Sequence, residues 1–509
     1  MEGNKRIAVN TVFLYTKFII TTLISLVVSR LVLKALGESD YGLYTVVGGI
    51  VTMLNTLGIS MVSTSYRYMT VEIGKGEKGN PNKTYNTIVV VHIVFALLLI
   101  LLGETAGVYY INNYLNINPN QIPDALFILH LSLATTAFAV ITIPMNGLII
   151  AREKFIFTSI VETLSALLKI ALIFVLINYE GNKLRFYAVI LAIIQFIIPL
   201  AYQIYCRIKE PEVVKWCLNK NIDDYKNLFS FALWIFFGAM ALIGKNQGSA
   251  LIINFFFGTI LNAAFGLAIQ ISQAVSSFTA TLRQAAIPQI MKSQGAGNEN
   301  RSLSLVYTIS KYSYLSMNIV AIPVLMNIDY ILKLWLDEIP IYTNIFICFM
   351  LINGMISNLG AGFDASIQAT GKIRKNQIGY SLINLSLLPL VYIMYKIGLP
   401  PYVNVVCMLV ITIVVLLFQI HIMTELTSFN IKKYINITIK PALMSTILAV
   451  TPILFISNYF NKVGHTNIIL ILISFVWTCF SIYLCGITKD EKQIIIGVLK
   501  KRFYKQIKE

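Results

Sequence analysis

The sequence predicts an all-α polytopic membrane protein with about fourteen transmembrane helices. Three observations lead to this fold class. Of the 509 residues, 57% are hydrophobic and only 12% are charged, which is about half the charged share of a soluble domain. The mean hydropathy is +0.74. Several apolar runs exceed the roughly 20 residues that cross a bilayer core as a helix. This composition excludes a soluble globular protein and a disordered chain.

Charged residues, glycine and proline bound the apolar windows and so define the predicted spans. The boundary after residue 254 is the least marked, because the chain stays apolar as far as Phe257, and we expect a tight turn at Gly258. The spans are 8–34, 43–66, 84–111, 123–150, 155–178, 184–206, 228–254, 258–282, 304–328, 341–368, 377–396, 401–424, 439–460 and 467–487.

Basic residues fall on alternate sides of these spans. Counted together with three residues at the adjoining span ends (Arg185, Lys396 and Lys440), the N-terminal segment, the even-numbered gaps and the C-terminal tail hold 29 Lys and Arg residues, whereas the odd-numbered gaps hold 5. Because cytoplasmic loops carry the excess of Lys and Arg, both termini are predicted to be cytoplasmic. Most of the net charge of +17 therefore reflects topology, and no nucleic-acid partner is expected.

No feature of the sequence predicts catalysis. The loops are short, the four histidines are scattered, and there is no phosphate-binding loop. The six cysteines lack the spacing of metal ligands. We expect neither an enzyme nor a metal or cofactor, so the function must lie among the helices.

The C-terminal tail combines a helix start with an amphipathic pattern. Thr488 and Glu491 have the spacing of a capping box. Apolar residues then recur every four positions from Ile495 to Ile507, with Lys and Arg between them. We expect a basic amphipathic helix on the anionic inner leaflet, the alternative being a solvated tail.

An internal repeat relates the segment 36–44 to the segment 257–265, which align without gaps. One glycine, one small residue and two aromatic positions match, and chance similarity between apolar sequences is the alternative. The alignment predicts two pseudo-symmetric six-helix lobes around a central cavity, followed by two extra C-terminal helices. The predicted divisions are an N-lobe (1–206), a cytoplasmic linker (207–227), a C-lobe (228–424), a segment with the last two spans (425–487) and the basic tail (488–509).

Ionisable residues within spans are candidates for a functional site, since a charge at the bilayer centre costs at least about 2.5–3.5 kcal/mol. Lys17 lies near the middle of the first span, and we expect it to face the cavity. Arg30 lies nearer the end of that span. Its side chain is expected either to face the cavity or to extend to the membrane interface. Glu162 and Lys169 lie seven residues apart on one face of the fifth span. We expect each either to act in substrate transport or to pair with a residue of another helix.

Polar residues of the seventh and eighth predicted spans predict a cavity wall, and the tenth span carries a further polar stripe. Lys245 belongs to the polar run 244–249, and Gln270 and Gln273 follow in the next span. The alternative for Lys245 is a helix end at the outer interface. In the tenth span, Asn353 and Asp364 belong to a stripe of small and polar residues. Three roles are open for Asp364: it carries a proton during transport, it is the counter-ion of a lysine, or it lies near the cytoplasmic mouth of the cavity and does neither.

The segment from Ser29 to Tyr44, with its Leu36-Gly37-Glu38-Ser39-Asp40-Tyr41-Gly42-Leu43-Tyr44 motif, resembles the opening of bacterial polysaccharide flippases. These flippases, which include the O-antigen and repeat-unit flippases, belong to the multidrug/oligosaccharidyl-lipid/polysaccharide exporter superfamily. The likeness in span number and loop length extends over the chain, but only this segment is a recognisable motif.

The resemblance implies movement of undecaprenyl-pyrophosphate-linked oligosaccharide across the bacterial cytoplasmic membrane, from the inner to the outer leaflet, by alternating access. Lipopolysaccharide or capsule synthesis would be the setting, with membrane lipids and polysaccharide polymerase or assembly proteins as partners. On this interpretation the residues that bind substrate are Lys17, Arg30, Lys169, Lys245, Gln270, Gln273 and Asn353. Glu162 and Asp364 couple transport to an H⁺ or Na⁺ gradient.

Rival functions remain open from the sequence. A drug/cation antiporter of the same superfamily is expected to use buried acids, whereas the first span has a lysine and no acid. A lipid II flippase is poorly separated by sequence. A membrane polymerase would need an enzyme site on a large loop. A purely structural protein would not need five buried cations, which are Lys17, Arg30, Lys169, Lys245 and, near the cytoplasmic end of the ninth span, Lys311.

Overall fold

The computed structural model describes residues 2–113, 119–335, 339–460, 467–488 and 491–492. Throughout these ranges the secondary structure is helical, with no strand, as the sequence predicts. Among the described residues, nine helices are long and apolar enough to cross a membrane, or eleven if each of two bent helix pairs is one span. Three of the predicted spans are not in that count. Those at 8–34 and 43–66 fall on α1 (Glu2–Gly74), and the one at 258–282 falls on the second half of α8 (Ile222–Gly295). The number of fourteen spans therefore stays a prediction.

Helix ends agree closely with the predicted span ends. The span predicted at 155–178 is α5, Phe155–Ile177, and the span predicted at 401–424 is α15, Val403–Leu426. The remaining α-helices are α1 (Glu2–Gly74), α2 (Pro81–Leu102), α3 (Val108–Asn113), α4 (Ile122–Ala151), α6 (Lys183–Lys209), α7 (Pro211–Val214), α8 (Ile222–Gly295), α9 (Glu299–Met326), α10 (Ile328–Trp335), α11 (Thr343–Leu359), α12 (Phe363–Thr370), α13 (Arg374–Leu385), α14 (Leu387–Lys396), α16 (Ile431–Tyr434), α17 (Lys440–Phe460) and α18 (Asn467–Ser481). Short 3₁₀ or π turns are η1 (Gly76–Lys78), η2 (Gly103–Gly107), η3 (Pro119–Gln121), η4 (Ile435–Ile439) and η5 (Ile482–Gly486).

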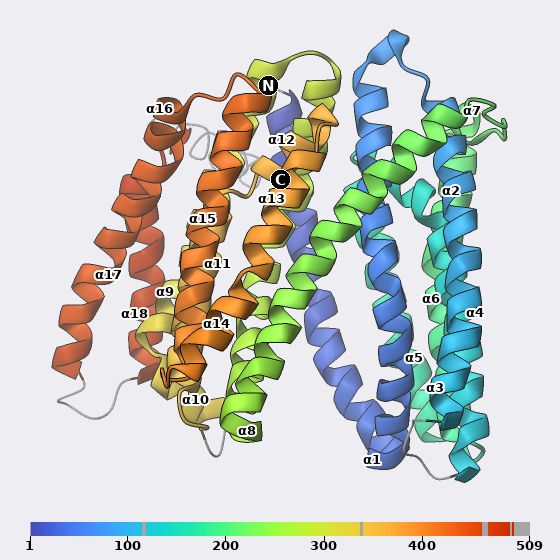
Figure 1. Ribbon diagram of the computed structural model, residues 1–509, viewed down its shortest axis with the longest axis horizontal. Coiled ribbons are helices and arrows are strands. Elements are labelled where there is room, and N and C mark those ends of the chain that lie inside the picture. Colours follow the sequence, from blue (N-terminus) through green and yellow to red (C-terminus); the bar gives the residue numbers. More distant parts are fainter. Residues whose placement is uncertain (1, 114–118, 336–338, 461–466, 489–490, 493–509) are drawn as a thin grey trace, which may run out of the picture. The chain divides into compact units, whose positions relative to one another are not determined.

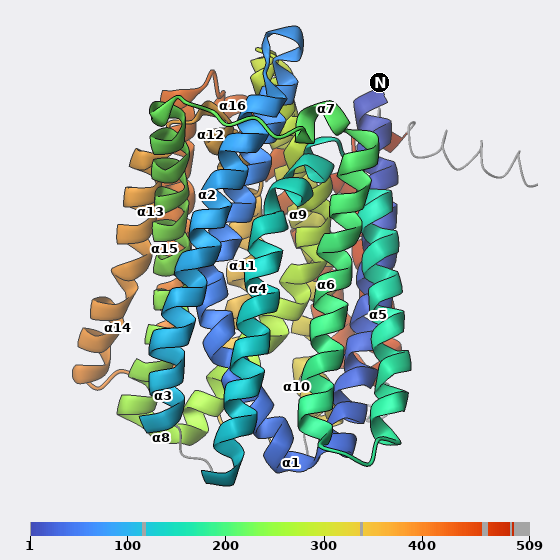
Figure 2. The same ribbon diagram turned by 90° about the vertical axis from the view of Figure 1, so that its right-hand side faces the viewer.

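The chain forms two compact units. Unit 1 comprises residues 1–240, 284–302 and 368–378, and unit 2 comprises residues 241–283, 303–367 and 379–509. Each unit has its own apolar core. In unit 1, α2, α4, α6 and α5 lie side by side, and α4 packs against α1, α2 and α6 (Figures 1 and 2). In unit 2, α11 packs on α15 and α17 packs on α18.

Each half of the sequence opens with one very long helical element. α1 has 73 residues and α8 has 74, and a straight helix of this length would span about 110 Å, several times a bilayer core. Each must therefore bend back, and Figure 1 shows the two legs of α1 meeting at one end. The predicted repeat places Leu36 over Phe257, and the same offset moves the bounds of α1 to 223–295, nearly the bounds of α8.

The tight turn expected at Gly258 is confirmed. Gly258 has φ 79° and ψ −172°, and it separates two helices within α8. Only glycine adopts this backbone region readily, because any side chain would clash with the backbone. The glycine therefore converts one continuous apolar run into two spans.

Polar contacts within unit 1 agree with the predicted alternation of loops. Asp124 pairs with Arg185 and accepts from the Asn182 amide, joining the third and fifth gaps. The second and sixth gaps meet elsewhere, through the ion pair of Lys83 with Asp224. Which membrane side each end faces stays a prediction.

The capping box at the start of the tail is confirmed. The Thr488 N–H donates to Glu491 Oε2 at 2.8 Å, and the Glu491 N–H donates to Thr488 Oγ1 at 3.4 Å. Glu491 also pairs with Lys311 of α9 at 2.7 Å. The predicted amphipathic helix after it lies outside the described residues.

Candidate functional site

Lys17 in α1 forms a polar cluster with two residues of neighbouring helices. Its Nζ lies 2.9 Å from Oε2 of Glu162 in α5. The hydroxyl of Tyr202 in α6 donates to Oε1 of the same carboxylate at 3.0 Å. The two predicted site residues are thus paired with each other, and the carboxylate neutralises the lysine charge that we expected to be available to an anion.

The other predicted cations of unit 1 show no comparable arrangement. Lys169 is half-buried in α5, and within the described part of the chain it has neither a hydrogen bond nor an ion pair. Arg30 lies in α1, but its side chain is not among those described.

Unit 2 contains a polar cavity of about 310 Å³ within its membrane-spanning helices. Four predicted site residues from three helices line it: Lys245, Gln273, Asn353 and Asp364. The fifth residue predicted nearby, Gln270, is exposed and does not line the cavity. On this part of α8, the residues that line the cavity are Ile269, Ser272, Gln273 and Ser276.

Lys245 is the most buried charge on this cavity, with 6% of the residue exposed. Its ammonium donates to Oδ1 of Asn384 at 2.9 Å, and the Asn384 amide donates in turn to the Tyr380 carbonyl. The second bond fixes the amide so that its oxygen faces the lysine. Across the described chain, no carboxylate lies within ion-pair distance of Lys245. Its charge is therefore solvated by an amide and left uncompensated.

The predicted stripe of the tenth span lines the cavity, but the span itself is broken. α11 ends at Leu359 and α12 begins at Phe363, with a bend of 43° between them. Gly360 and Ala361 of the break line the cavity together with Ser357. Interrupted helices at a binding cavity are typical of transporters, because the freed backbone groups face water or ligand.

The two other predicted residues of this span offer acceptors to the cavity. Asn353 Oδ1 is buried and accepts no hydrogen bond from the described residues. Asp364 is exposed within unit 2, at the start of α12, and accepts from the Gln419 amide at 3.1 Å. A carboxylate with an amide donor is less available to a passing cation than a bare one.

Sequence reasoning missed Arg283, which lines the same cavity. Because it directly follows the predicted eighth span, it counts among the basic residues of a loop in the sequence analysis. A signal is nevertheless present: Arg283 follows Ser276 by seven residues and so falls on the same face of α8. Tyr380, Asn384, Thr412 and Gln419 also line the cavity and were missed.

These features define an all-helical fold that has, within the described residues, nine to eleven candidate membrane spans and a polar cavity beside a bent helix pair. Solved transporters share its fold. An outward-facing multidrug resistance MATE family transporter of the MOP superfamily aligns with a TM-score of 0.72 at 13% identity, over 83% of this chain and 96% of its own. A MATE protein in a bent conformation gives 0.73 at 14% identity, over 84% and 96%. A MOP superfamily transporter from Pyrococcus furiosus gives 0.71 at 14% identity, over 83% and 96%.

At these identities the likeness shows the fold and not the substrate. No family model matches the chain, and no curated protein matches its sequence. The fold expected from the N-terminal resemblance is therefore confirmed, and the choice among the functions that this fold supports depends on the site.

Proposed function

We propose that the protein is a flippase that moves a pyrophosphate-linked oligosaccharide lipid across the cytoplasmic membrane of a bacterium. The observation that carries the proposal is the charge of the cavity in unit 2. Lys245 and Arg283 line it against one carboxylate, Asp364. A buried lysine without a carboxylate partner is costly in a membrane. An anionic ligand would offset that cost each time it binds, since the lysine offers a charge-assisted hydrogen bond in a low dielectric.

The rest of the lining suits a sugar. Gln273, Ser276 and Asn353 come from two helices and present donors and acceptors without net charge. The unpaired Oδ1 of Asn353 would accept from a hydroxyl, which removes the penalty of a buried acceptor without a donor. The lysine and arginine would hold the phosphates, and the amides and hydroxyls would hold the sugar, while the prenyl chain stays in lipid.

Glu162 is our candidate for ion coupling in unit 1. Protonation of its carboxyl would remove the charge that holds Lys17 at 2.9 Å and free this cation. A proton gradient would thereby change the charge of α1 during the cycle. Asp364, with its amide donor, is the second candidate, and Na⁺ is the alternative coupling ion.

A multidrug antiporter is the second candidate function, because MATE transporters of that kind share the fold. Another transporter with this fold, that of Pyrococcus furiosus, is described by a binding pocket of reverse polarity that suggests a different function. Pocket polarity therefore discriminates where the fold does not. Two cations against one carboxylate disfavour a cationic drug and favour an anionic substrate.

The experiment is a flipping assay in proteoliposomes that contain the purified protein. One substrate is a fluorescent short-chain prenyl-pyrophosphate oligosaccharide, and the other is a cationic dye. We expect flipping of the first and no transport of the second. Lys245→Met should slow flipping about tenfold or more. Two opposite charges 4 Å apart attract each other by roughly 4 kcal/mol at an effective dielectric of 20. Losing about a third of that attraction between the lysine and the phosphate already corresponds to a tenfold effect, about 1.4 kcal/mol.

Lys396→Met is the matched control, because Lys396 is exposed at the end of α14 and does not line the cavity. It should flip lipid at the wild-type rate. Transport of the cationic dye without flipping of the oligosaccharide lipid would refute the proposal in favour of the antiporter.

A further inference from the structure

A second cavity lies entirely within unit 1 and has a volume of about 640 Å³. It forms where α1 ends, where α2 and α8 begin, and where the chain turns from α12 into α13. It shares no lining residue with the cavity of unit 2. Its size falls within the range of small-molecule sites.

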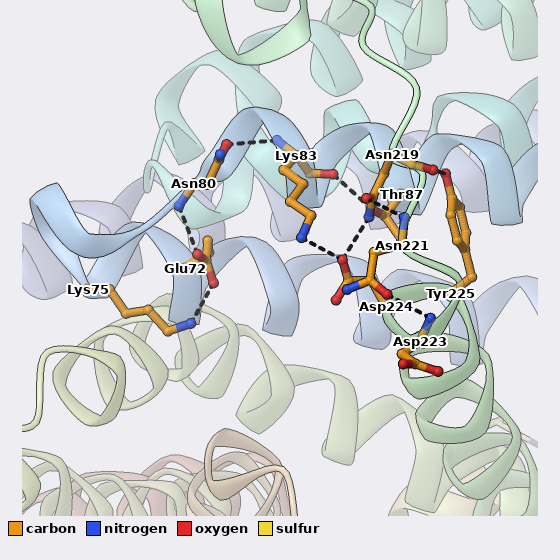
Figure 3. A network of polar contacts seen from close by, with 10 residues as sticks. All are labelled: Glu72, Lys75, Asn80, Lys83, Thr87, Asn219, Asn221, Asp223, Asp224 and Tyr225. Atoms are coloured by element: carbon orange, nitrogen blue, oxygen red, sulfur yellow. Dashed lines mark hydrogen bonds and ion pairs between the residues drawn. The ribbon is translucent and has the colours of Figure 1, made fainter.

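The two carboxylates on this cavity are already neutralised. Glu72 pairs with Lys75 at 2.8 Å and accepts from the Asn80 N–H at 2.8 Å. Asp224 pairs with Lys83 at 2.7 Å, and the Asn219 amide adds a bond of 2.8 Å to it. Figure 3 shows both pairs together with the bonds that Asn80 and Asn219 donate to their carboxylates.

The cavity is also lined by three further cations, Arg67, Lys372 and Arg374. Among the described residues none of them has a carboxylate within ion-pair distance, although Glu72 is near enough to Arg67 to act on its charge. Arg67 lies over the rings of Tyr68 and Phe231, at 4.5 Å and 4.9 Å, and its Nε donates to the Gln368 carbonyl at 2.9 Å. These contacts fix the guanidinium and leave further N–H groups for a ligand. Arg374 lies 5.4 Å from the ring centre of Trp234, and Lys372 is exposed.

Gly371 brings the chain close to Arg67. A Cβ at this position would lie 2.8 Å from the Arg67 Nη2 atom, and the residue has φ +79°. Glycine thus allows the loop to approach the guanidinium, so that Lys372 and Arg374 reach the same cavity. The cations come from two segments that are far apart in the sequence and that the fold brings together.

We propose that this cavity binds a phosphate group, carried either by an anionic lipid headgroup or by a soluble phosphorylated molecule. Guanidinium groups match the oxygen geometry of phosphate, and here they are preorganised on aromatic rings. The surplus of positive charge remains after both carboxylates have been paired. The proposal is independent of the flippase function, because it concerns different residues in a different unit.

The test is a binding measurement on the purified protein in nanodiscs of phosphatidylcholine, titrated with inorganic pyrophosphate by calorimetry. All variants carry Lys245→Met and Arg283→Gln, which remove both cations that line the cavity of unit 2, so that phosphate binding there does not contribute. A second arm uses nanodiscs with phosphatidylglycerol, and native mass spectrometry counts the retained lipid. The variants are Lys372→Ala and Arg374→Gln, with Lys375→Ala as the matched control, because Lys375 lies in the same segment but does not line the cavity.

We expect saturable binding in at least one arm, weakened about tenfold by Lys372→Ala and by Arg374→Gln, the loss expected for a charge-assisted bond. Lys375→Ala should change it less than twofold. Binding of pyrophosphate identifies a soluble source, and retention of phosphatidylglycerol alone identifies a headgroup; both support the site. No saturable binding in either arm overturns the proposal, and so does an equal loss in Lys375→Ala, which would indicate general surface charge.

Discussion

Gly258 offers a direct test of why α8 folds back. Its backbone, at φ 79° and ψ −172°, lies in a region that is essentially closed to other residues. Apart from the adjoining backbone, no atom of the described residues lies within 4 Å of the position that a Cβ would take. In Gly258→Ala, steric contact with neighbours adds nothing, so the change in free energy of unfolding comes from backbone strain alone. We expect a loss of about 1–3 kcal/mol.

Gly266→Ala is the matched control in the same element. Gly266 is exposed and has an ordinary helical backbone, and beyond its own helix no atom of the described part of the chain lies within 4 Å of the position that a methyl group would take. Alanine is the better helix former, so this variant should gain about 0.5–1 kcal/mol. The two variants should therefore differ by about 1.5–4 kcal/mol.

The assay is equilibrium unfolding in mixed detergent micelles, followed by circular dichroism. Gly258→Asn distinguishes this backbone region from the left-handed helical one, which asparagine tolerates. We expect Gly258→Asn to be as unstable as Gly258→Ala. Equal stability of Gly258→Ala and Gly266→Ala would refute the assignment of the turn to glycine strain.

Further predictions concern the ion pairs of Lys311 with Glu491 and of Lys17 with Glu162. Burial raises the pKa of the Glu491 carboxyl, but bonds from Lys311 and Thr488 outweigh it and hold the pKa below 4.5. The pair therefore stabilises the protein above pH 4.5, and this contribution is lost as the pH falls through the lower folded-state pKa. Glu491→Gln should flatten that pH dependence and lower the melting temperature at pH 7, measured by thermal unfolding, since it leaves Lys311 buried without a counter-charge. Glu162→Gln should make flipping independent of a proton gradient across the proteoliposome; unchanged dependence would exclude Glu162 as the coupling group.

The fold was predictable because its main signals are local. Long apolar runs bounded by charge locate spans such as α5 and α15 within a few residues. The break at Gly258 was visible as a glycine in an apolar run, and the internal repeat is reflected in the bounds of α1 and α8. The bend between α11 and α12 was not predicted, although Gly360 and Gly362 lie there.

The site was predictable only where one helix face carries it. The stripe from Asn353 to Asp364 was visible in the sequence, because residues three, four and seven apart share a face, and the structure places it on the cavity. Arg283 was missed because a basic residue at a span end usually marks a loop. The pairing of Lys17 with Glu162 depends on how two helices are rotated, which a single sequence does not specify.

The cavity of unit 1 could not be derived from the sequence. Its basic residues belong to segments that we interpreted as separate cytoplasmic loops. Their charges were assigned to topology, and that assignment stays a prediction. What the sequence lacks is the tertiary contact that places Arg67 beside Gly371.

The central claim is that Lys245 contacts the pyrophosphate of the substrate. The most direct measurement is a thermodynamic cycle of binding, with the wild type and Lys245→Met each tested against one oligosaccharide on a prenyl pyrophosphate and on a prenyl monophosphate. If the contact exists, replacing the pyrophosphate linkage by a monophosphate should cost the wild type about tenfold more affinity than it costs Lys245→Met. Equal losses in the two proteins would contradict the claim.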